Sequence, residues 1–235
     1  NLLMYGINDV FDYESDIRNP RKGGIEGAIE QKTFHPTIIW SSIILSTPFI
    51  VYLLIVGNLM SNILLIILMF AVVAYSAPVL RFKEIPILDS ITSSLHFVGP
   101  MLYALSLNGL EPGRLPYLIA FFIWGMSSHA FGAVQDILPD RQGNLSSIGT
   151  VLGAKITVRI VCLLYLTSSV ILILGGGLGA IVGLTSLLYV ANVIQFWNLN
   201  DERSAISNIG WKRFIWLNMI TGFVVTMVLI IKYVI

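Results

Sequence analysis

TFHPTIIWSSIILSTPFIVYLLIVGNLMSNILLIILMFAVVAYSAPVL, residues 33–80, contains no Asp, Glu, Lys or Arg. A transmembrane helix needs about 20 consecutive apolar residues, because each helical residue advances only about 1.5 Å. A stretch of this length is therefore long enough for two passes through a bilayer. The pair Gly57 and Asn58 marks a turn between them. The sequence thus predicts helices over Pro36–Val56 and Leu59–Tyr75.

The composition of the whole chain points the same way. Its 235 residues are 56% hydrophobic and only 11% charged, whereas an ordinary soluble domain has about 25% charged residues. Residues 1–235 are therefore expected to form a single integral membrane domain. The apolar segments lack the alternation of a β-barrel, which favours an all-α, polytopic helix bundle. The one cysteine, Cys162, lies in an apolar run and predicts neither a disulfide nor a metal cluster.

The remaining apolar segments complete this bundle. A stub at residues 1–11 is followed by the two helices above and by five further predicted spans: Ile87–Leu107, Leu115–Gln135, Val151 to about residue 174, Leu178–Trp197 and Phe214–Ile231. Because the chain opens inside an apolar pattern and not on Met, we expect that an N-terminal piece of the protein is missing.

Basic side chains gather on one side of the membrane if the passes alternate. Twelve of the 14 Lys and Arg residues fall on that side, and Arg114 and Lys232 fall on the other. The positive-inside rule places the richer side in the cytoplasm. The sequence therefore predicts a protein of a prokaryotic plasma membrane, with its polar chemistry at the cytoplasmic face.

The first acidic cluster is NDVFDYESD, residues 8–16. On a helix Asp12 lies about 60° from Asp9, and Asp16 lies between them in projection. Such close carboxylates repel unless a cation is present. Their oxygens, with Asn8 beside them, suit Mg²⁺. The alternative is a solvated helix end, but acids at a helix C-terminus oppose the helix dipole.

The second cluster is Asp136 and Asp140 in GAVQDILPDRQG, which we place on one face at the cytoplasmic end of a helix. Taken alone, an Asp-x-x-x-Asp spacing is weak evidence for a metal site. If the clusters face each other, Asn8, Asp9, Asp12, Asp16, Asp136 and Asp140 form a two-sided site for Mg²⁺ and a diphosphate.

Cationic and hydrogen-bonding side chains follow in YSAPVLRFK, residues 75–83. Arg81 and Lys83 are candidates to hold diphosphate oxygens, with Tyr75 as a further donor. They are alternatively topology anchors and an interfacial aromatic. Arg141, beside the second cluster, is a further candidate for substrate binding. Arg21 and Lys22, in the loop IRNPRKGG, are also candidates, or alternatively topology anchors.

Polar residues inside the membrane are functional candidates by default. His129 precedes Asp136 by two helical turns, so it shares that face about 10 Å deeper. It is a candidate to stabilise a cation, take a proton or bond a neighbouring helix. His96 and Asn192 are weaker candidates. We expect Asp89 to pair with Lys83 or Arg81.

The chemistry that fits is the ionisation of an allylic diphosphate. Mg²⁺ and cationic side chains would neutralise the leaving diphosphate. The apolar interior would hold the prenyl tail and exclude water from the allylic cation. Aromatic faces would stabilise this cation, with Phe11, Tyr13, Trp124 and Phe131 as candidates.

NDVFDYESD, YSAPVLRFK and DILPD, in this order and each at a helix end, resemble the motifs of the UbiA superfamily of intramembrane prenyltransferases over the whole chain. The resemblance implies a nine-helix bundle, here lacking its first helix and part of its second. It implies catalytic roles for Asp9, Asp12, Asp136, Asp140, Arg81 and Lys83. Mg²⁺ is the implied cofactor.

Within the superfamily, NDVFDYESDIRNPRKGG and RFIWLNMITGFVV look most like the lycopene elongase branch of C50 carotenoid biosynthesis. This implies transfer from dimethylallyl diphosphate to lycopene. Acceptors of sister branches, namely quinone head-group aromatics, chlorophyllide, haem and glyceryl phosphate lipids, stay open as alternatives. The expected partners are the donor, the lipophilic acceptor and the bilayer, with no nucleic acid.

Two other classes fit less well. GAVQDILPD matches the end of the CDP-alcohol phosphotransferase motif, but residues 118–123 read LIAFFI where that motif would begin with D-G-x-x-A-R. A transporter with an acidic vestibule would carry polar residues along the middle of several helices. Here the acids stay at one interface, which favours the enzyme.

Overall fold

The computed structural model describes residues 2–17 and 29–233, and every regular element in these ranges is helical. The predicted all-α bundle is therefore confirmed. The α-helices are α1 (Ile7–Asp16), α2 (His35–Val56), α3 (Leu59–Ser76), α4 (Leu88–Ser106), α5 (Leu115–Val134), α6 (Ile137–Gln142), α7 (Ile148–Leu174), α8 (Gly177–Ile194) and α9 (Asn208–Tyr233). A π-helical turn, Leu2–Gly6, leads into α1, and short 3₁₀ turns lie at Lys32–Phe34, Phe82–Glu84, Pro112–Arg114 and Asp201–Ser207.

The ends of these helices follow local chemistry. Asn58 and Ser61 form a reciprocal capping box at the start of α3, and Ser147 and Thr150 form another at the start of α7. Most predicted bounds agree with the structure to within a few residues. The exception is α9, which begins at Asn208 and not at Phe214, because the bilayer edge accepts the polar first turns of a spanning helix.

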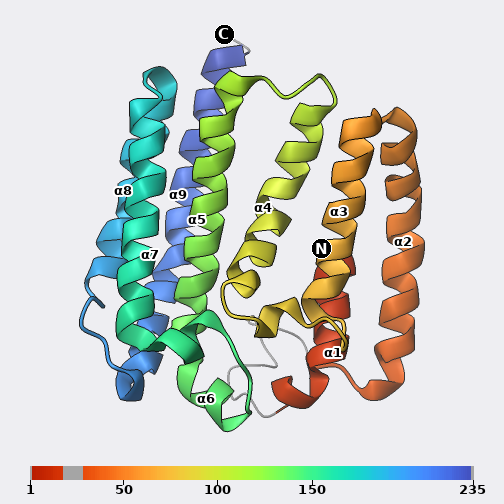
Figure 1. The fold of residues 1–235 in the computed structure, drawn as a ribbon, viewed down its shortest axis with the longest axis vertical. Coiled ribbons are helices and arrows are strands. Elements are labelled where there is room, and N and C mark those ends of the chain that lie inside the picture. The colour runs from red at the N-terminus through yellow and green to blue at the C-terminus, as the bar shows by residue number, and fades with distance from the viewer. Residues whose placement is uncertain (1, 18–28, 234–235) are drawn as a thin grey trace.

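Within the described residues, six helices are long and apolar enough to cross a membrane: α2, α3, α5, α7, α8 and α9. Seven spans were predicted. The seventh, α4, is a helix of 19 residues that runs between α3 and α5 (Figure 1), but Asp89, His96 and several Ser and Thr residues make it more polar than the others.

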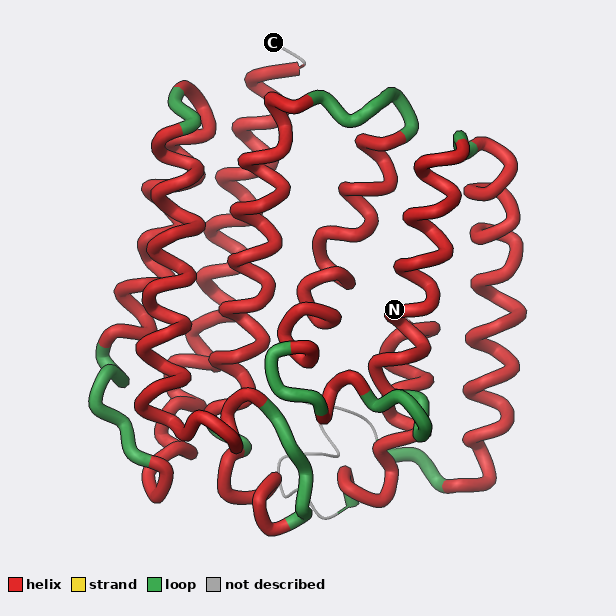
Figure 2. Tube along the Cα trace, viewed as in Figure 1, coloured by secondary structure: helices red, strands yellow, loops and turns green. Residues whose placement is uncertain are grey.

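The long helices run up and down in chain order, and their connections lie at the two ends of the bundle (Figures 1 and 2). α5 packs between α4 and α7, α7 packs against α8, and α8 packs against α9. On the other side, α3 packs against α4, while α1 contacts both α2 and α3. One end of the bundle therefore collects α1, α6 and the turns Phe82–Glu84 and Asp201–Ser207, and we call it the charged end.

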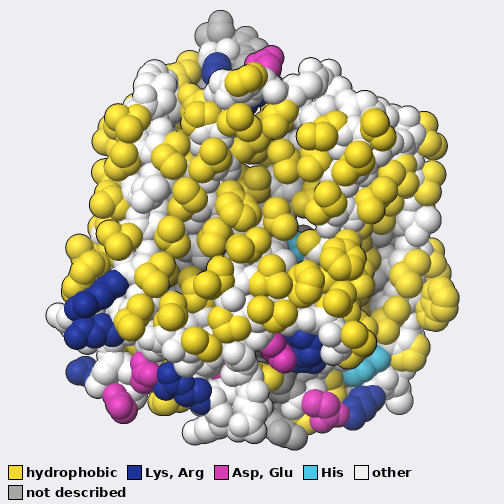
Figure 3. Space-filling view, in the orientation of Figure 1, with side chains coloured by type: hydrophobic (Ala, Val, Ile, Leu, Met, Phe, Trp, Pro, Cys, Tyr) yellow, Lys and Arg dark blue, Asp and Glu magenta, His cyan; other side chains and the backbone are white. Residues whose placement is uncertain are grey.

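The visible face of the molecule separates charged from apolar side chains along the bundle axis (Figure 3). Apolar side chains cover most of it, and nearly all of its charged side chains form a band at the charged end. This is the arrangement of a helix bundle in a bilayer, where a charged group in the hydrocarbon is costly.

The largest apolar core lies among α5, α7, α8 and α9, and includes Phe131, Val158, Tyr165, Tyr189 and Phe196. By contrast, α4 and α5 meet through small residues. A Cβ at Gly125 would lie 2.4 Å from the Oγ of Ser94, so these two backbones approach closely.

Candidate active site

The first acidic cluster lies on α1 at the charged end. Asp12 and Asp16 are buried, and Asp9 is partly exposed. Because α1 contacts α2 and α3, these carboxylates face the bundle. The Asn8 Oδ1 accepts a hydrogen bond of 2.7 Å from the Ser76 Oγ, which ties α1 to the last residue of α3. Sequence reasoning missed Ser76, although it directly follows the candidate Tyr75.

Lys83 and Arg81 reach this cluster from the Phe82–Glu84 turn. The Lys83 ammonium forms an ion pair with Asp12. The Arg81 guanidinium forms an ion pair with Glu84 and lies 3.9 Å from the Asp12 Oδ1. The predicted neighbours are thus brought together, from parts of the chain about 70 residues apart.

The electrostatics of Lys83 link the two acidic clusters. Burial lowers the pKa of Lys83 to about 8, and the negative charges of Glu84, Asp140 and Asp9 oppose this change. Asp9 belongs to the first cluster and Asp140 to the second. Acids from both clusters therefore stabilise the charge of one partly buried ammonium.

The turn that carries Lys83 has an unusual backbone. Arg81 has a φ of 39°, and Ile87, on the other side of the turn, has a φ of 74°. A β-branched residue rarely adopts a positive φ, and such strain is typical of segments that position functional groups.

The second cluster differs in detail from the prediction. Asp136 and Asp140 do not share one helix, because α5 ends at Val134 and Asp140 belongs to the short helix α6. Pro139 has no N–H to continue the hydrogen bonding of α5, which explains why a new helix starts there. Both aspartates remain partly exposed at the charged end, with Asp136 in the turn.

Carboxylate and amide oxygens on α1, with carboxylates on and beside α6, are a donor set that suits Mg²⁺. In the described residues, however, no three His, Cys, Asp or Glu side chains converge closely enough to hold a metal ion. Asp9 of the first cluster and Asp140 of the second both oppose the lowering of the Lys83 pKa by burial, so carboxylates of both clusters lie near enough to attract one cation. The residues present therefore fit a divalent cation in their chemistry and charge.

A cavity of about 250 Å³ extends from the ion pair into the bundle. Its polar wall contains Asn8, Asp12 and Lys83, and the rest of its lining comes from α1, α3 and α4 and the turn before α1: Met4, Tyr5, Tyr75, Ser93, His96 and Phe97. Sequence reasoning missed Met4, Tyr5, Ser93 and Phe97, since only the packing of the Leu2–Gly6 turn and of α4 against α3 brings them to the site.

None of the four aromatic candidates for cation stabilisation, Phe11, Tyr13, Trp124 and Phe131, is among the lining residues of this cavity. Phe131 is buried against Phe196, and Trp124 stacks on Phe121 and Phe214, so both belong to the packing around α5, α8 and α9. Tyr75 does line the cavity, with its ring centroid 5.3 Å from that of His96 and 6.3 Å from that of His129.

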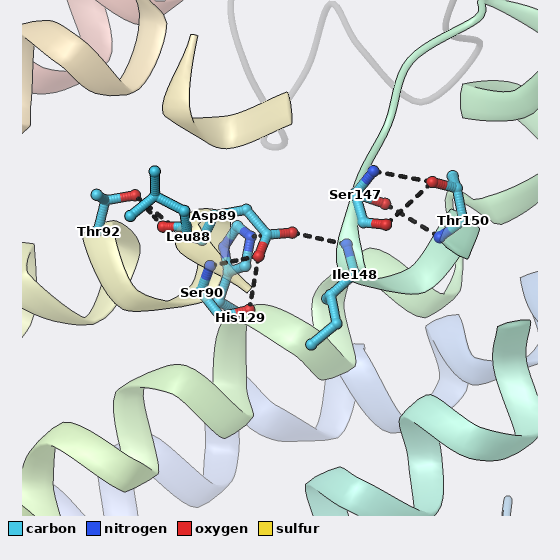
Figure 4. Close-up of polar contacts among 8 residues, drawn as sticks. All are labelled: Leu88, Asp89, Ser90, Thr92, His129, Ser147, Ile148 and Thr150. Atoms are coloured by element: carbon cyan, nitrogen blue, oxygen red, sulfur yellow. Dashed lines mark hydrogen bonds and ion pairs between the residues drawn. The ribbon is translucent and has the colours of Figure 1, made fainter. Parts of the chain in front are cut away.

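The predicted pairing of Asp89 with Lys83 or Arg81 is also wrong. Asp89 is fully buried, and its Oδ2 accepts a 2.8 Å hydrogen bond from the backbone N–H of Ile148. The same oxygen lies 3.8 Å from the His129 Nε2 (Figure 4). Asp89 thus joins α4 to α5 and to the start of α7, because a buried carboxylate needs such partners. A substrate-binding role for His129 stays a prediction.

Arg141 has partners on the far side of α6. Its guanidinium donates to the Thr150 carbonyl at 2.7 Å and pairs with Asp201 at 2.7 Å. Asp201 in turn accepts the N–H of Ala154 at 2.7 Å. Arg141 therefore connects α6, α7 and the Asp201–Ser207 turn, and its binding to substrate stays a prediction. Arg21 and Lys22 lie outside the described residues.

Comparisons with known proteins agree with this geometry. The model of the UbiA prenyltransferase family matches residues 1–219. The lycopene elongase/hydratase of Corynebacterium glutamicum is 48% identical over 98% of this chain and 81% of its own length. A C50 β-cyclic carotenoid biosynthesis protein of Dietzia sp. is 46% identical, over 98% of this chain and 54% of its own.

The fold has a solved counterpart as well. The apo structure of a UbiA homolog from Aeropyrum pernix K1 superimposes with a TM-score of 0.61, and it covers 91% of this chain and 86% of that chain at 18% identity. This likeness concerns the fold alone. Because the family model covers nearly the whole sequence, the chain is a member of the UbiA prenyltransferase family.

Proposed function

We propose that this protein transfers a prenyl group from an allylic diphosphate, dimethylallyl diphosphate, to lycopene in C50 carotenoid biosynthesis. The observation that carries the chemistry is the partly buried Lys83, which pairs with Asp12 and lies in the field of Asp9 and Asp140. The choice of acceptor is supported by the 48% identity with a lycopene elongase/hydratase over 98% of the chain.

The charged end would hold the diphosphate. Asn8, Asp9, Asp12, Asp16, Asp136 and Asp140 would hold Mg²⁺, which when bound neutralises negative charge on the leaving group. Lys83 and Arg81 face the same place and would stabilise the charge that develops on the bridging oxygen as the C–O bond breaks. The Asp12 carboxylate keeps the Lys83 ammonium in position.

The cavity would hold the isoprenoid part of the donor. Met4, Tyr5 and Phe97 line it beside the polar groups. Apolar walls exclude water from an allylic cation, and aromatic faces attract positive charge. A hydrocarbon acceptor needs no charged partner, which agrees with the apolar surface above the charged end (Figure 3).

The proposal includes an orientation, with the charged end facing the cytoplasm of a prokaryotic cell. The excess of Lys and Arg at this end supports it, because basic loops are retained on the cytoplasmic side. The donor would then be taken from the cytoplasm and the acceptor from the bilayer.

Expression in lycopene-producing cells tests the function. We expect C45 and C50 pigments with the wild type, measured by mass analysis. Asp12→Asn should lower product formation by about 100-fold or more, because the buried site loses one negative charge of its cation-holding set. In purified protein, a chelator should abolish diphosphate release and added Mg²⁺ should restore it.

The matched control is Glu111→Gln, an acid at the opposite end of the bundle that pairs with Arg114. It should retain wild-type product formation. Membrane accumulation of each variant is measured alongside. An active Asp12→Asn variant would refute the site, whereas unchanged lycopene with the wild type would refute the acceptor and direct the search to aromatic acceptors.

A further inference from the structure

The cavity contains a second basic group that the diphosphate does not need. His96 lies on α4, seven residues after Asp89, so it is about 10 Å farther from the charged end. It lines the same cavity as Asp12 and Lys83. A group at this depth is too far from the charged end to bind the diphosphate, but it lies at the level where the hydrocarbon part of the donor would bind.

The imidazole of His96 belongs to the cavity lining and has one nitrogen without a hydrogen-bond partner among the described residues. This nitrogen, Nε2, is buried. In the neutral tautomer that carries its proton on Nδ1, Nε2 presents a lone pair. Tyr75 packs edge-on against the ring, with centroids 5.3 Å apart, and fixes its orientation.

The other titratable groups nearby are less suited to accept a proton. Lys83 is paired with Asp12, and His129 is paired with Asp89. Tyr5 and Tyr75 are phenols, whose hydroxyl oxygens are weaker bases than an imidazole nitrogen. Among the described residues that line the cavity, His96 is thus the neutral base.

The proposed reaction releases one proton that needs an acceptor. The C–O bond of the donor breaks, and the diphosphate leaves with the electron pair. The acceptor double bond then attacks the allylic cation, so that a C–C bond forms and a tertiary cation remains on the acceptor. Either this cation loses a proton from the adjacent carbon, whose C–H electron pair becomes a new double bond, or water adds to it and loses a proton.

We propose that the Nε2 of His96 is the base that takes this proton and ends the reaction. This inference rests on the proposed function and adds a catalytic residue to it. The lone pair of Nε2 forms the new N–H bond, and the imidazolium returns the proton to solvent after product release.

The test compares His96→Gln with the wild type in purified protein supplied with dimethylallyl diphosphate, Mg²⁺ and lycopene. Two quantities are measured together, diphosphate released and prenylated product formed. We expect the ratio of product to diphosphate to fall about 100-fold, the usual contribution of a general base. Diphosphate release should persist, with prenyl alcohol formed by capture of the allylic cation by water.

His35→Gln is the matched control, since His35 lies at the charged end outside the cavity lining, and it should keep the wild-type ratio. Diphosphate release also reports that a variant is folded. His96→Ala provides the second variant, and added imidazole should restore its product ratio by filling the vacated space. The end groups of the restored product, alkene or alcohol, show whether the proton comes from carbon or from water.

A wild-type ratio in His96→Gln would overturn the inference and leave the proposed function intact. Failure of imidazole to restore product in His96→Ala would overturn it as well. A wild type that does not prenylate lycopene would refute the proposed acceptor first, and the inference with it.

Discussion

Lys83 shows how one side chain connects distant parts of the sequence. It is a partly buried ammonium on a strained turn, paired with Asp12 on α1 and influenced by Asp140 on α6. A cation placed among carboxylates keeps them ionised and close together before any substrate binds. Lys83 therefore has a structural reason to be at this position, in addition to its proposed role in diphosphate binding.

Substitution of Lys83 tests this dual role. Lys83→Met removes the ammonium from Asp12 and from the diphosphate, so we expect kcat/KM for the donor to fall by about 10²–10³-fold. Lys83→Arg keeps the charge and should lose less. Steady-state kinetics of diphosphate release measures both, with the exposed Lys212→Met as control. Wild-type kinetics in Lys83→Met would contradict the role.

At the scale of the elements, α7 is shaped by a contact outside the site. Gly153 interrupts it with φ 76° and ψ 164°, a conformation that is essentially restricted to glycine. The interruption lets Asp201 accept the N–H of Ala154, while Arg141 pairs with Asp201 from the α6 side. These contacts connect the short helix α6, which carries Asp140, to α7.

Gly153→Ala should disturb this joint. A Cβ at Gly153 would lie 2.9 Å from the Asp201 Oδ1, in a backbone region that alanine avoids. We expect a loss of about 1–3 kcal/mol in the free energy of unfolding, seen as a lower melting temperature in detergent. Gly222→Ala, on α9 with nothing within 4 Å of its added Cβ, is the control and should not lower it. Equal melting temperatures would argue against strain at Gly153.

At the scale of the whole molecule, the bundle has a charged end and apolar flanks. In the proposed function, the ionic donor would bind at α1, α6 and the Phe82–Glu84 turn, and the hydrocarbon parts would bind in the cavity between α1, α3 and α4. Among the described residues, the up-and-down order of the helices brings the charged connections to one end, except the one that carries Glu111 and Arg114 (Figures 1 and 3).

This orientation predicts which positions face the outside of the cell. In a Cys162→Ala background, which has no other cysteine, Glu111→Cys should react with a membrane-impermeant maleimide in intact cells. Glu202→Cys, at the charged end, should react only after lysis. The ratio of labelling before and after lysis is the measurement, and equal labelling of the two sites would contradict the assigned topology.

The sequence alone determined the membrane-embedded all-α fold, most helix bounds and the two acidic motifs. These features depend on local properties, namely apolar length, turn residues and the spacing of charges along a helix. Through the family resemblance it also predicted that Arg81 and Lys83 belong to the same site as the acidic motifs, and the structure shows that both lie near Asp12.

Only the tertiary structure decided which side chains meet across helices. Asp89 is paired with His129 and Ile148 and not with Lys83, and Trp124 and Phe131 belong to the packing around α5 and not to the cavity. Likewise, only the structure shows that the Nε2 of His96 has no hydrogen-bond partner among the described residues. The physical reason is that a uniformly apolar helix carries little record of which of its faces meets a neighbour, since lipid and protein interior are equally apolar.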